Sequence, residues 1–140
     1  MKSYRELDVW QTSIELAEKI HAASQNFPKD EMFGLKSQIR RAAYSVPSNI
    51  AEGFGRGHTK EFIQFINTAN GSLYETETQL TLAVKFKYIS REEAIEIWSL
   101  TQRIGMMLNK LKKALQKRLI KTSSVQNIHN EPRATNHDPR

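Results

Sequence analysis

The chain has 140 residues, 39% of them hydrophobic, which is enough apolar material for one domain with a buried core. It contains no cysteine, and this excludes disulfides, thiolate metal sites and cysteine nucleophiles. The 21 Lys and Arg residues exceed the 15 Asp and Glu residues, and the resulting net charge of +6 favours polyanionic partners.

Residues 1–10 are polar and charged where a signal peptide would need an apolar stretch. No run in the chain approaches the ~20 apolar residues of a membrane span. We therefore expect a cytoplasmic protein that has no contact with a membrane.

Residues 6–25 are expected to form the first helix. Apolar side chains recur along this segment at steps of three or four, the spacing of one helical face: Leu7, Trp10, Ile14 and Ala17. Pro28 separates this helix from the next, because proline disfavours the helical conformation of the residue before it.

A second helix is expected to start near Lys29 or Asp30. Pro47 lies inside its helical pattern, where proline removes one backbone donor and clashes with the carbonyl group of Ala43. The pattern therefore predicts a kink between Ala43 and Pro47, after which the helix resumes.

The second helix is expected to end in a glycine-rich turn. Glu52 precedes Arg56 by four residues, which predicts a favourable ion pair on one helical face. Three glycines then interrupt the pattern: Gly53, Gly55 and Gly57. They indicate a turn and not a nucleotide-binding loop, since no buried strand precedes them and no lysine followed by serine or threonine completes such a loop.

Thr59 is the expected N-cap of a third helix that runs to about Phe86. Gly71 lies inside this helix, where glycine costs about 1 kcal/mol relative to alanine. It therefore indicates either the close approach of a neighbouring helix or tolerated flexibility. Ser90 and Glu93 form a Ser-x-x-Glu capping box, which predicts the start of a fourth helix.

Residues 1–120 are therefore expected to form one all-α domain, an antiparallel up-down-up-down four-helix bundle with a kinked second helix. Residues 121–140 contain two prolines and few apolar side chains. We expect a disordered polar tail there, because too little surface can be buried to offset the entropy of ordering.

The sequence offers little for catalysis. Glu18 and His21 match one Glu-x-x-His element of a di-iron site, but the second element that such a site needs is missing. No serine or threonine stands in a recognisable nucleophile context. We expect no enzymatic activity, no metal and no cofactor.

Polar residues form a stripe along the second helix, at steps of three or four: Gln38, Arg41, Ser45, Asn49, Glu52 and Arg56. Two interpretations of the stripe remain open. In the first, these side chains satisfy backbone groups freed by Pro47 and pair with Glu52, within the subunit or across a subunit boundary. In the second, Arg40, Arg41 and Arg56 face a phosphate backbone, which guanidinium groups bind bidentately.

A second basic segment lies near the C-terminal end of the domain. No acidic residue occurs between Ser99 and Asn130. The same stretch carries Arg103, Lys110, Lys112, Lys113, Lys117, Arg118 and Lys121. This concentration of cations complements the dipole of the fourth helix and is also an electrostatic footprint for nucleic acid.

Several segments together resemble a known family, the 23S rRNA intervening-sequence four-helix-bundle proteins. The signature is carried by Gln38-Ile39-Arg40-Arg41-Ala42-Ala43, Ser45-Val46-Pro47-Ser48-Asn49-Ile50-Ala51-Glu52-Gly53 and Gly55-Arg56. The likeness extends over about residues 4–118 through Leu7-Asp8-Val9-Trp10, Phe27-Pro28, Phe33-Gly34-Leu35 and Ala69-Asn70-Gly71-Ser72-Leu73-Tyr74-Glu75. Within the signature, the structural motif consists of Pro47, Asn49, Glu52 and Gly53.

The resemblance implies four antiparallel helices and adds an assembly, a pentameric ring. The family includes, or is closely similar to, the accessory variability determinant of diversity-generating retroelements. That protein is a basic pentamer that partners a reverse transcriptase and binds nucleic acid.

We therefore expect a homo-oligomeric bundle that binds structured RNA, or DNA, through phosphate contacts. The candidate contact residues are Arg40, Arg41, Arg56, Arg103, Lys110, Lys113 and Lys117. Trp10, Phe62 and Phe65 follow the apolar stripes, so contacts to the backbone of folded RNA are favoured over base stacking. The alternative is a protein-interaction scaffold or an accessory subunit for a partner such as a reverse transcriptase.

Overall fold

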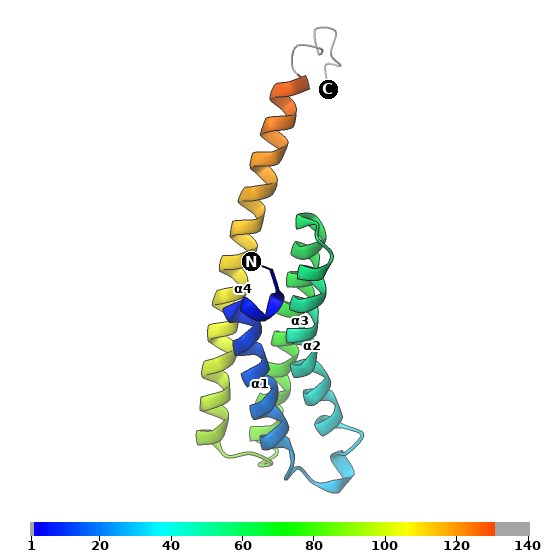
Figure 1. Cartoon of the computed structure of the whole chain (residues 1–140). Coiled ribbons are helices and arrows are strands. Elements are labelled where there is room, and N and C mark those ends of the chain that lie inside the picture. Colours follow the sequence, from blue (N-terminus) through cyan, green and yellow to red (C-terminus); the bar gives the residue numbers. More distant parts are fainter. Residues whose placement is uncertain (1, 131–140) are drawn as a thin grey trace, which may run out of the picture.

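The computed structural model describes residues 2–130, which form four α-helices and two short 3₁₀ turns without any strand. The elements are η1 (Tyr4–Glu6), α1 (Asp8–Ser24), η2 (Lys29–Glu31), α2 (Leu35–Gly55), α3 (Thr59–Lys85) and α4 (Arg91–Asn130). Successive helices run in opposite directions, and α4 returns to pack on α1 (Figure 1). The predicted all-α bundle of four antiparallel helices is confirmed.

The core lies where the apolar stripes of the four helices meet. Its largest fully buried side chains include Leu16, Ile20, Ile39, Ile50, Ile66, Leu80, Ile104 and Leu108. Burying one such side chain stabilises the fold by about 1.5–3 kcal/mol relative to leaving it exposed. Trp10 and Phe62 pack against the edge of this core, in agreement with the sequence pattern. In the part of the chain described, no helix has the length and apolar character needed to cross a membrane.

Helix α2 begins at Leu35, later than the predicted start at Lys29 or Asp30. The residues Lys29–Glu31 form a separate 3₁₀ turn. Gly34 then has φ −108° and ψ −118°, which is outside the helical region and prevents the turn from joining the helix. The early start was wrong because favourable acidic residues stabilise a helix end without deciding where it lies.

The start of α2 is stabilised by a carboxylate in place of an N-cap side chain. Glu31 Oε1 accepts a hydrogen bond from the Leu35 N–H at 3.1 Å, and Glu31 Oε2 accepts one from the Tyr88 hydroxyl at 2.8 Å. These two donors, the Leu35 amide first, hold the pKa of Glu31 below its ordinary value. The same contact joins the start of α2 to the turn between α3 and α4.

Helix α2 continues through Pro47 as far as Gly55, and its close approach to α3 occurs at Gly53. A Cβ atom on Gly53 would lie 2.6 Å from Phe65 Cβ and 2.9 Å from a ring carbon of Phe62. A Cβ atom on Gly71 would meet nothing within 4 Å, so the interpretation of Gly71 as a close-approach site within the chain is wrong. Gly71 lies on the exposed side of α3, whereas Gly53 is buried at the contact. The kink near Pro47 remains a prediction.

The observed start and end of α3 and the start of α4 lie within one residue of the positions that the sequence predicted. Gly57 has φ +76° in the α2–α3 turn, a conformation that glycine adopts without strain. His58, and not Thr59, is the N-cap of α3. At the start of α4, the Glu93 N–H donates to Ser90 Oγ at 3.2 Å, as the capping box predicts.

Helix α4 is longer than the sequence suggested and extends past the ends of the other helices (Figure 1). It continues to Asn130, so the predicted disordered tail is wrong for residues 121–130. The reason is that adding a residue to an existing helix avoids the cost of nucleation, and the first proline after the helix is Pro132. Residues 131–140 of the predicted tail lie outside the described residues.

Candidate nucleic-acid interface

The basic residues singled out in the sequence lie on two separate sides of the bundle. Arg40, Arg41 and Arg56 belong to α2, and Arg103 and the three candidate lysines belong to α4. In the described chain α2 and α4 make no contact with each other, because they occupy diagonal corners of the bundle (Figure 1). The two sets therefore cannot form one continuous surface in a single subunit.

Arg40 is bound inside the subunit, at the C-terminal end of α1. Its Nε donates to Ser24 Oγ at 2.7 Å, and its Nη2 donates to the His21 carbonyl oxygen at 2.9 Å and to Gln25 Oε1 at 2.8 Å. The last carbonyl groups of a helix lack backbone partners, and a cation is favourable at that end. Arg40 therefore joins α2 to α1, and its occupied donors favour the structural interpretation of this residue.

The two other arginines of α2 differ from Arg40. Arg56 Nη2 lies 3.0 Å from Glu52 Oε1, which confirms the predicted pair, and its guanidinium lies 5.2 Å from the centre of the Phe65 ring. Such an exposed pair contributes little stability. Arg41 is exposed and has no hydrogen-bond or ion-pair partner among the described residues. It borders a shallow cavity of about 780 Å³ on the outer side of α2, together with Lys36.

The polar residues around Pro47 bind the backbone and the neighbouring helix. Asn49 Nδ2 donates to both the carbonyl oxygen and the Oγ of Ser45, each at 2.8 Å. The Ser72 hydroxyl of α3 donates to Ser45 Oγ at 2.9 Å, so the network crosses from α2 to α3. The Ser48 hydroxyl donates at 2.9 Å to a carbonyl four residues earlier. This arrangement agrees with the structural interpretation only in that the side chains bind within the subunit, because the accepting carbonyls belong to Tyr44 and Ser45 and not to Ala43, which Pro47 deprives of its donor.

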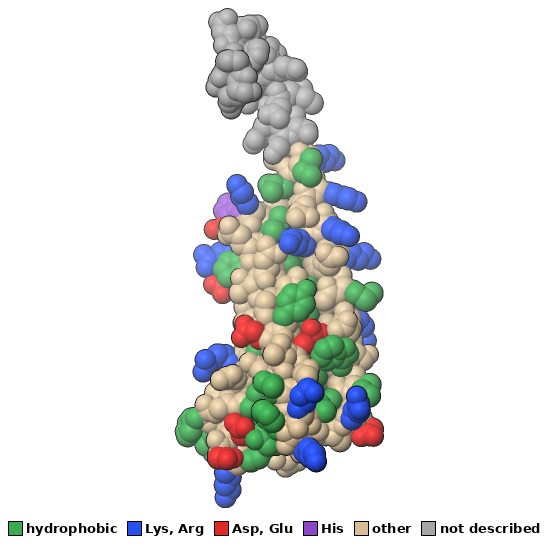
Figure 2. All heavy atoms as spheres, turned by 180° about the vertical axis from the view of Figure 1, so that it is seen from behind, with side chains coloured by type: hydrophobic (Ala, Val, Ile, Leu, Met, Phe, Trp, Pro, Cys, Tyr) green, Lys and Arg blue, Asp and Glu red, His purple; other side chains and the backbone are tan. Residues whose placement is uncertain are grey.

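The C-terminal half of α4 presents a different arrangement, in which the lysines form no ion pair with any residue that the structure describes. Lys110, Lys113 and Lys117 are all exposed, and steps of three and four place them on one side of the helix. They span about 10 Å along the axis at ~1.5 Å per residue. None has an ion-pair partner among the described residues, and Figure 2 shows Lys and Arg side chains along this edge of the molecule.

Two further residues define the limits of this lysine face. Arg103 lies two turns before Lys110, and its Nη2 is 3.9 Å from Glu15 Oε2 on α1, so its charge is partly compensated. Lys121 is exposed and follows Lys117 by four residues, which extends the face. Lys121 belongs to the basic segment seen in the sequence but was not among the predicted contact residues, although its spacing from Lys117 already indicated the same helical side.

The described residues hold no group of three His, Cys, Asp or Glu side chains that could bind a metal ion. The His21 ring, considered for a di-iron element, lies with its Nδ1 2.8 Å from the Tyr44 hydroxyl. The exposed side chains without ion-pair partners among the described residues include the lysines of α4 and Arg41. Chemically, such groups can bind anions such as phosphates.

Comparisons with known proteins agree on one family. The model of the 23S rRNA-intervening sequence proteins matches residues 5–110. A crystal structure of a protein of unknown function from the S23 ribosomal protein family of Bacteroides thetaiotaomicron is similar, with a TM-score of 0.70 and 28% identity. The match covers 75% of this chain and 95% of that one. No curated protein matches.

Proposed function

Since the chain belongs to the 23S rRNA-intervening sequence protein family, we propose that it is a non-enzymatic, homo-oligomeric bundle that binds structured RNA in the cytoplasm. The contacts are made to phosphate groups by the lysine face of α4, which we define as Lys110, Lys113, Lys117 and Lys121. Arg41 is a secondary candidate on the opposite side of the bundle.

The observation that carries this proposal is that the lysine face has no ion-pair partner among the described residues. The sequence has no acidic residue between Ser99 and Asn130, so no carboxylate on this part of α4 can pair with these lysines. Lysines that stay hydrated on the surface bind phosphate as point charges, and the release of counterions drives the association. Binding of this kind has low sequence specificity.

Assembly of several subunits would strengthen such contacts. A single face with a few lysines binds nucleic acid weakly, but several linked faces raise the overall affinity through effective concentration. The resemblance to pentameric relatives makes a pentamer the expected assembly. Light scattering of the purified protein tests this part directly, and a monomer mass at micromolar concentration would contradict it.

The RNA-binding part is tested by measuring affinity for a folded RNA and for duplex DNA over a range of salt concentrations. The test variant changes Lys110, Lys113 and Lys117 to Ala. We expect its affinity to fall at least about tenfold and its salt slope to become shallower by about 2–3, because each lost phosphate contact removes nearly one unit of slope.

The matched control changes three exposed lysines elsewhere, Lys2, Lys29 and Lys60, to Ala. It removes the same net charge without touching the lysine face. Equal losses of RNA affinity in the two triple variants would show that the total charge of the protein, and not the position of the lysines, determines the affinity. Salt-independent binding by the wild type would contradict phosphate recognition altogether.

A further inference from the structure

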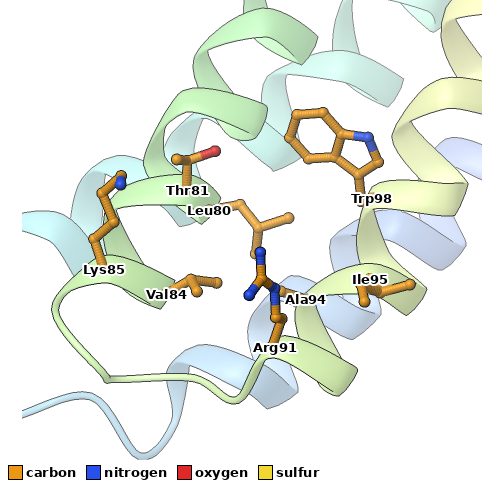
Figure 3. A pocket seen from close by; sticks show the side chains of 8 residues that line it. All are labelled: Leu80, Thr81, Val84, Lys85, Arg91, Ala94, Ile95 and Trp98. Carbon is orange, nitrogen blue, oxygen red and sulfur yellow. The ribbon is translucent and has the colours of Figure 1, made fainter.

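A groove between α3 and α4 lies outside the lysine face and has no part in the proposed RNA contact. It occupies the junction where α3 ends and α4 begins, and its volume is about 360 Å³. The side chains that define it are Leu80, Val84, Lys85, Arg91, Ile95 and Trp98. Figure 3 shows Arg91 and Trp98 projecting from α4 over the junction, with Leu80 between them and Lys85 on the α3 side.

The groove has an apolar surface that the subunit leaves uncovered. Leu80 is 1% exposed and forms the floor, whereas Ile95 is 62% exposed and Trp98 is 42% exposed. Ile95 and Trp98 are three residues apart and therefore adjacent on the same side of α4. Large apolar side chains grouped around a cavity are typical of an interaction site, while single exposed ones are not.

The apolar surface continues along α4 beyond the groove. Met106 is 73% exposed and lines a second cavity of the same helix pair together with Tyr74, which is 65% exposed. The distance from Ile95 to Met106 along the helix is about 16 Å at ~1.5 Å per residue, which corresponds to three helical turns. Figure 2 shows hydrophobic side chains scattered along this α3–α4 side of the molecule. A surface of this length suits a peptide segment better than a small molecule.

The charged residues that line the groove are cations, although Glu92 and Glu93 lie beside Arg91 in the first turn of α4. The two lining cations, Lys85 and Arg91, are both exposed, and neither forms an ion pair with a described residue. Arg91 is also the first residue of α4, where the positive end of the helix dipole disfavours a cation. A carboxylate placed there would interact favourably with both side chains and with the helix end.

The opposite end of the surface does not attract anions. Glu77 lines the second cavity, and its Oε2 accepts hydrogen bonds from Thr101 Oγ1 at 2.7 Å and from Gln102 Nε2 at 2.8 Å. The surface is therefore positive at Arg91 and negative at Glu77. A complementary partner carries its acidic residues at one end only.

From these features we infer that the α3–α4 groove binds a short amphipathic segment of another protein. Large apolar side chains of that segment cover Ile95, Trp98 and Met106, and an Asp or Glu at one end pairs with Arg91 and Lys85. A second copy of this chain is the alternative occupant, and the mass of the assembly distinguishes the two.

The probe for this inference is a synthetic amphipathic helical peptide with leucines at helical spacing and two glutamates at one end. Its binding is followed by the fluorescence of Trp98 in a Trp10→Phe background, since the chain has two tryptophans. We expect saturable binding, weakened about tenfold when both glutamates are replaced by glutamine. Absence of saturable binding overturns the inference.

Two protein variants test the residues of the groove. Arg91→Glu is compared with Lys60→Glu, which makes the same charge change at an exposed site on α3 away from the groove. Ile95→Ser is compared with Ile120→Ser, which makes the same substitution at another exposed isoleucine of α4. We expect about tenfold weaker peptide binding for each groove variant and less than about twofold for each control. Equal losses in a groove variant and its control would show non-specific attraction and overturn the inference.

The mass of the assembly and the affinity for RNA complete the test. If Ile95→Ser lowers the mass of the wild-type assembly, a second copy covers the groove and the inference is wrong. We expect Ile95→Ser to keep both its mass and its RNA affinity. Loss of RNA binding in the lysine variant and loss of peptide binding in Ile95→Ser are thus separate results, and either proposal can fail alone.

Discussion

Helix α2 and the lysine face of α4 both carry basic residues that the sequence singled out, yet their side chains are used differently. On α2, Arg40 binds the end of α1, and Asn49 binds the backbone of its own helix. On α4, Lys110, Lys113 and Lys117 remain exposed without ion-pair partners among the described residues. The comparison teaches that a basic residue becomes a candidate for ligand binding only when no partner in the fold has already taken its donors.

The strongest test of α2 as a packing element is Gly53→Ala. The added methyl group would lie 2.6 Å from Phe65 Cβ, an atom that cannot move without shifting α3. We expect a loss of about 1–3 kcal/mol in the free energy of unfolding, measured by urea denaturation. The control is Gly71→Ala, which meets nothing within 4 Å and should stabilise the protein by up to about 1 kcal/mol. Stabilisation by both substitutions would refute the close contact at Gly53.

Neighbouring arginines of α2 provide the next test. Arg40→Ala removes three hydrogen bonds at the end of α1, and we expect it to lower the free energy of unfolding by about 1–2 kcal/mol. Arg41→Ala should change it by less than about 0.5 kcal/mol, because its side chain is exposed and unpaired among the described residues. Similar values for the two variants in denaturant titrations would remove the distinction between bound and free arginines.

A smaller effect is expected at the network beside Pro47. Asn49→Ala removes two hydrogen bonds to Ser45, and we expect a loss of about 1 kcal/mol. The same measurement on Lys113→Ala, from the lysine face, should stay within about 0.5 kcal/mol of the wild type. A larger loss for Lys113→Ala than for Asn49→Ala would reverse the comparison between α2 and α4.

The smallest expected effect is a change in the pKa of Glu31, the carboxylate at the start of α2. The pKa of Glu31 lies below its ordinary value of 4.5, so the charged form is favoured in the folded state. Its contribution to stability is present above pH 4.5 and is lost as the pH falls through the lowered pKa. We expect Tyr88→Phe to move the pKa of Glu31 upward, toward 4.5, because one of its two donors is removed.

A carboxyl NMR titration measures this change, with Tyr74→Phe, an exposed residue elsewhere on α3, as the control. An unchanged Glu31 titration in Tyr88→Phe would show that the hydroxyl does not influence the carboxylate. At the alkaline end, the contact with Glu31 raises the pKa of Tyr88 above its ordinary value of 10.0. The hydrogen bond is therefore present at neutral pH and is lost only as the pH rises through that raised pKa.

The sequence alone determined the features that depend on neighbouring residues. Helical spacing predicted the four helices and much of their buried stripe, the Ser90–Glu93 pair predicted the start of α4, and Glu52 and Arg56 form the pair that their spacing required. These interactions lie within one or two turns of a helix, so the order of residues fixes their geometry.

Only the tertiary structure decided which basic residues are free. Arg40 finds its partners 15 to 19 residues away, on α1 and at its C-cap residue Gln25, and Gly53 lies against Phe65 of the next helix. The diagonal positions of α2 and α4 likewise separate two basic segments that the sequence could not place relative to each other. Contacts of this kind depend on how helices pack, and helical periodicity gives the buried side of each helix but not the partner that it meets.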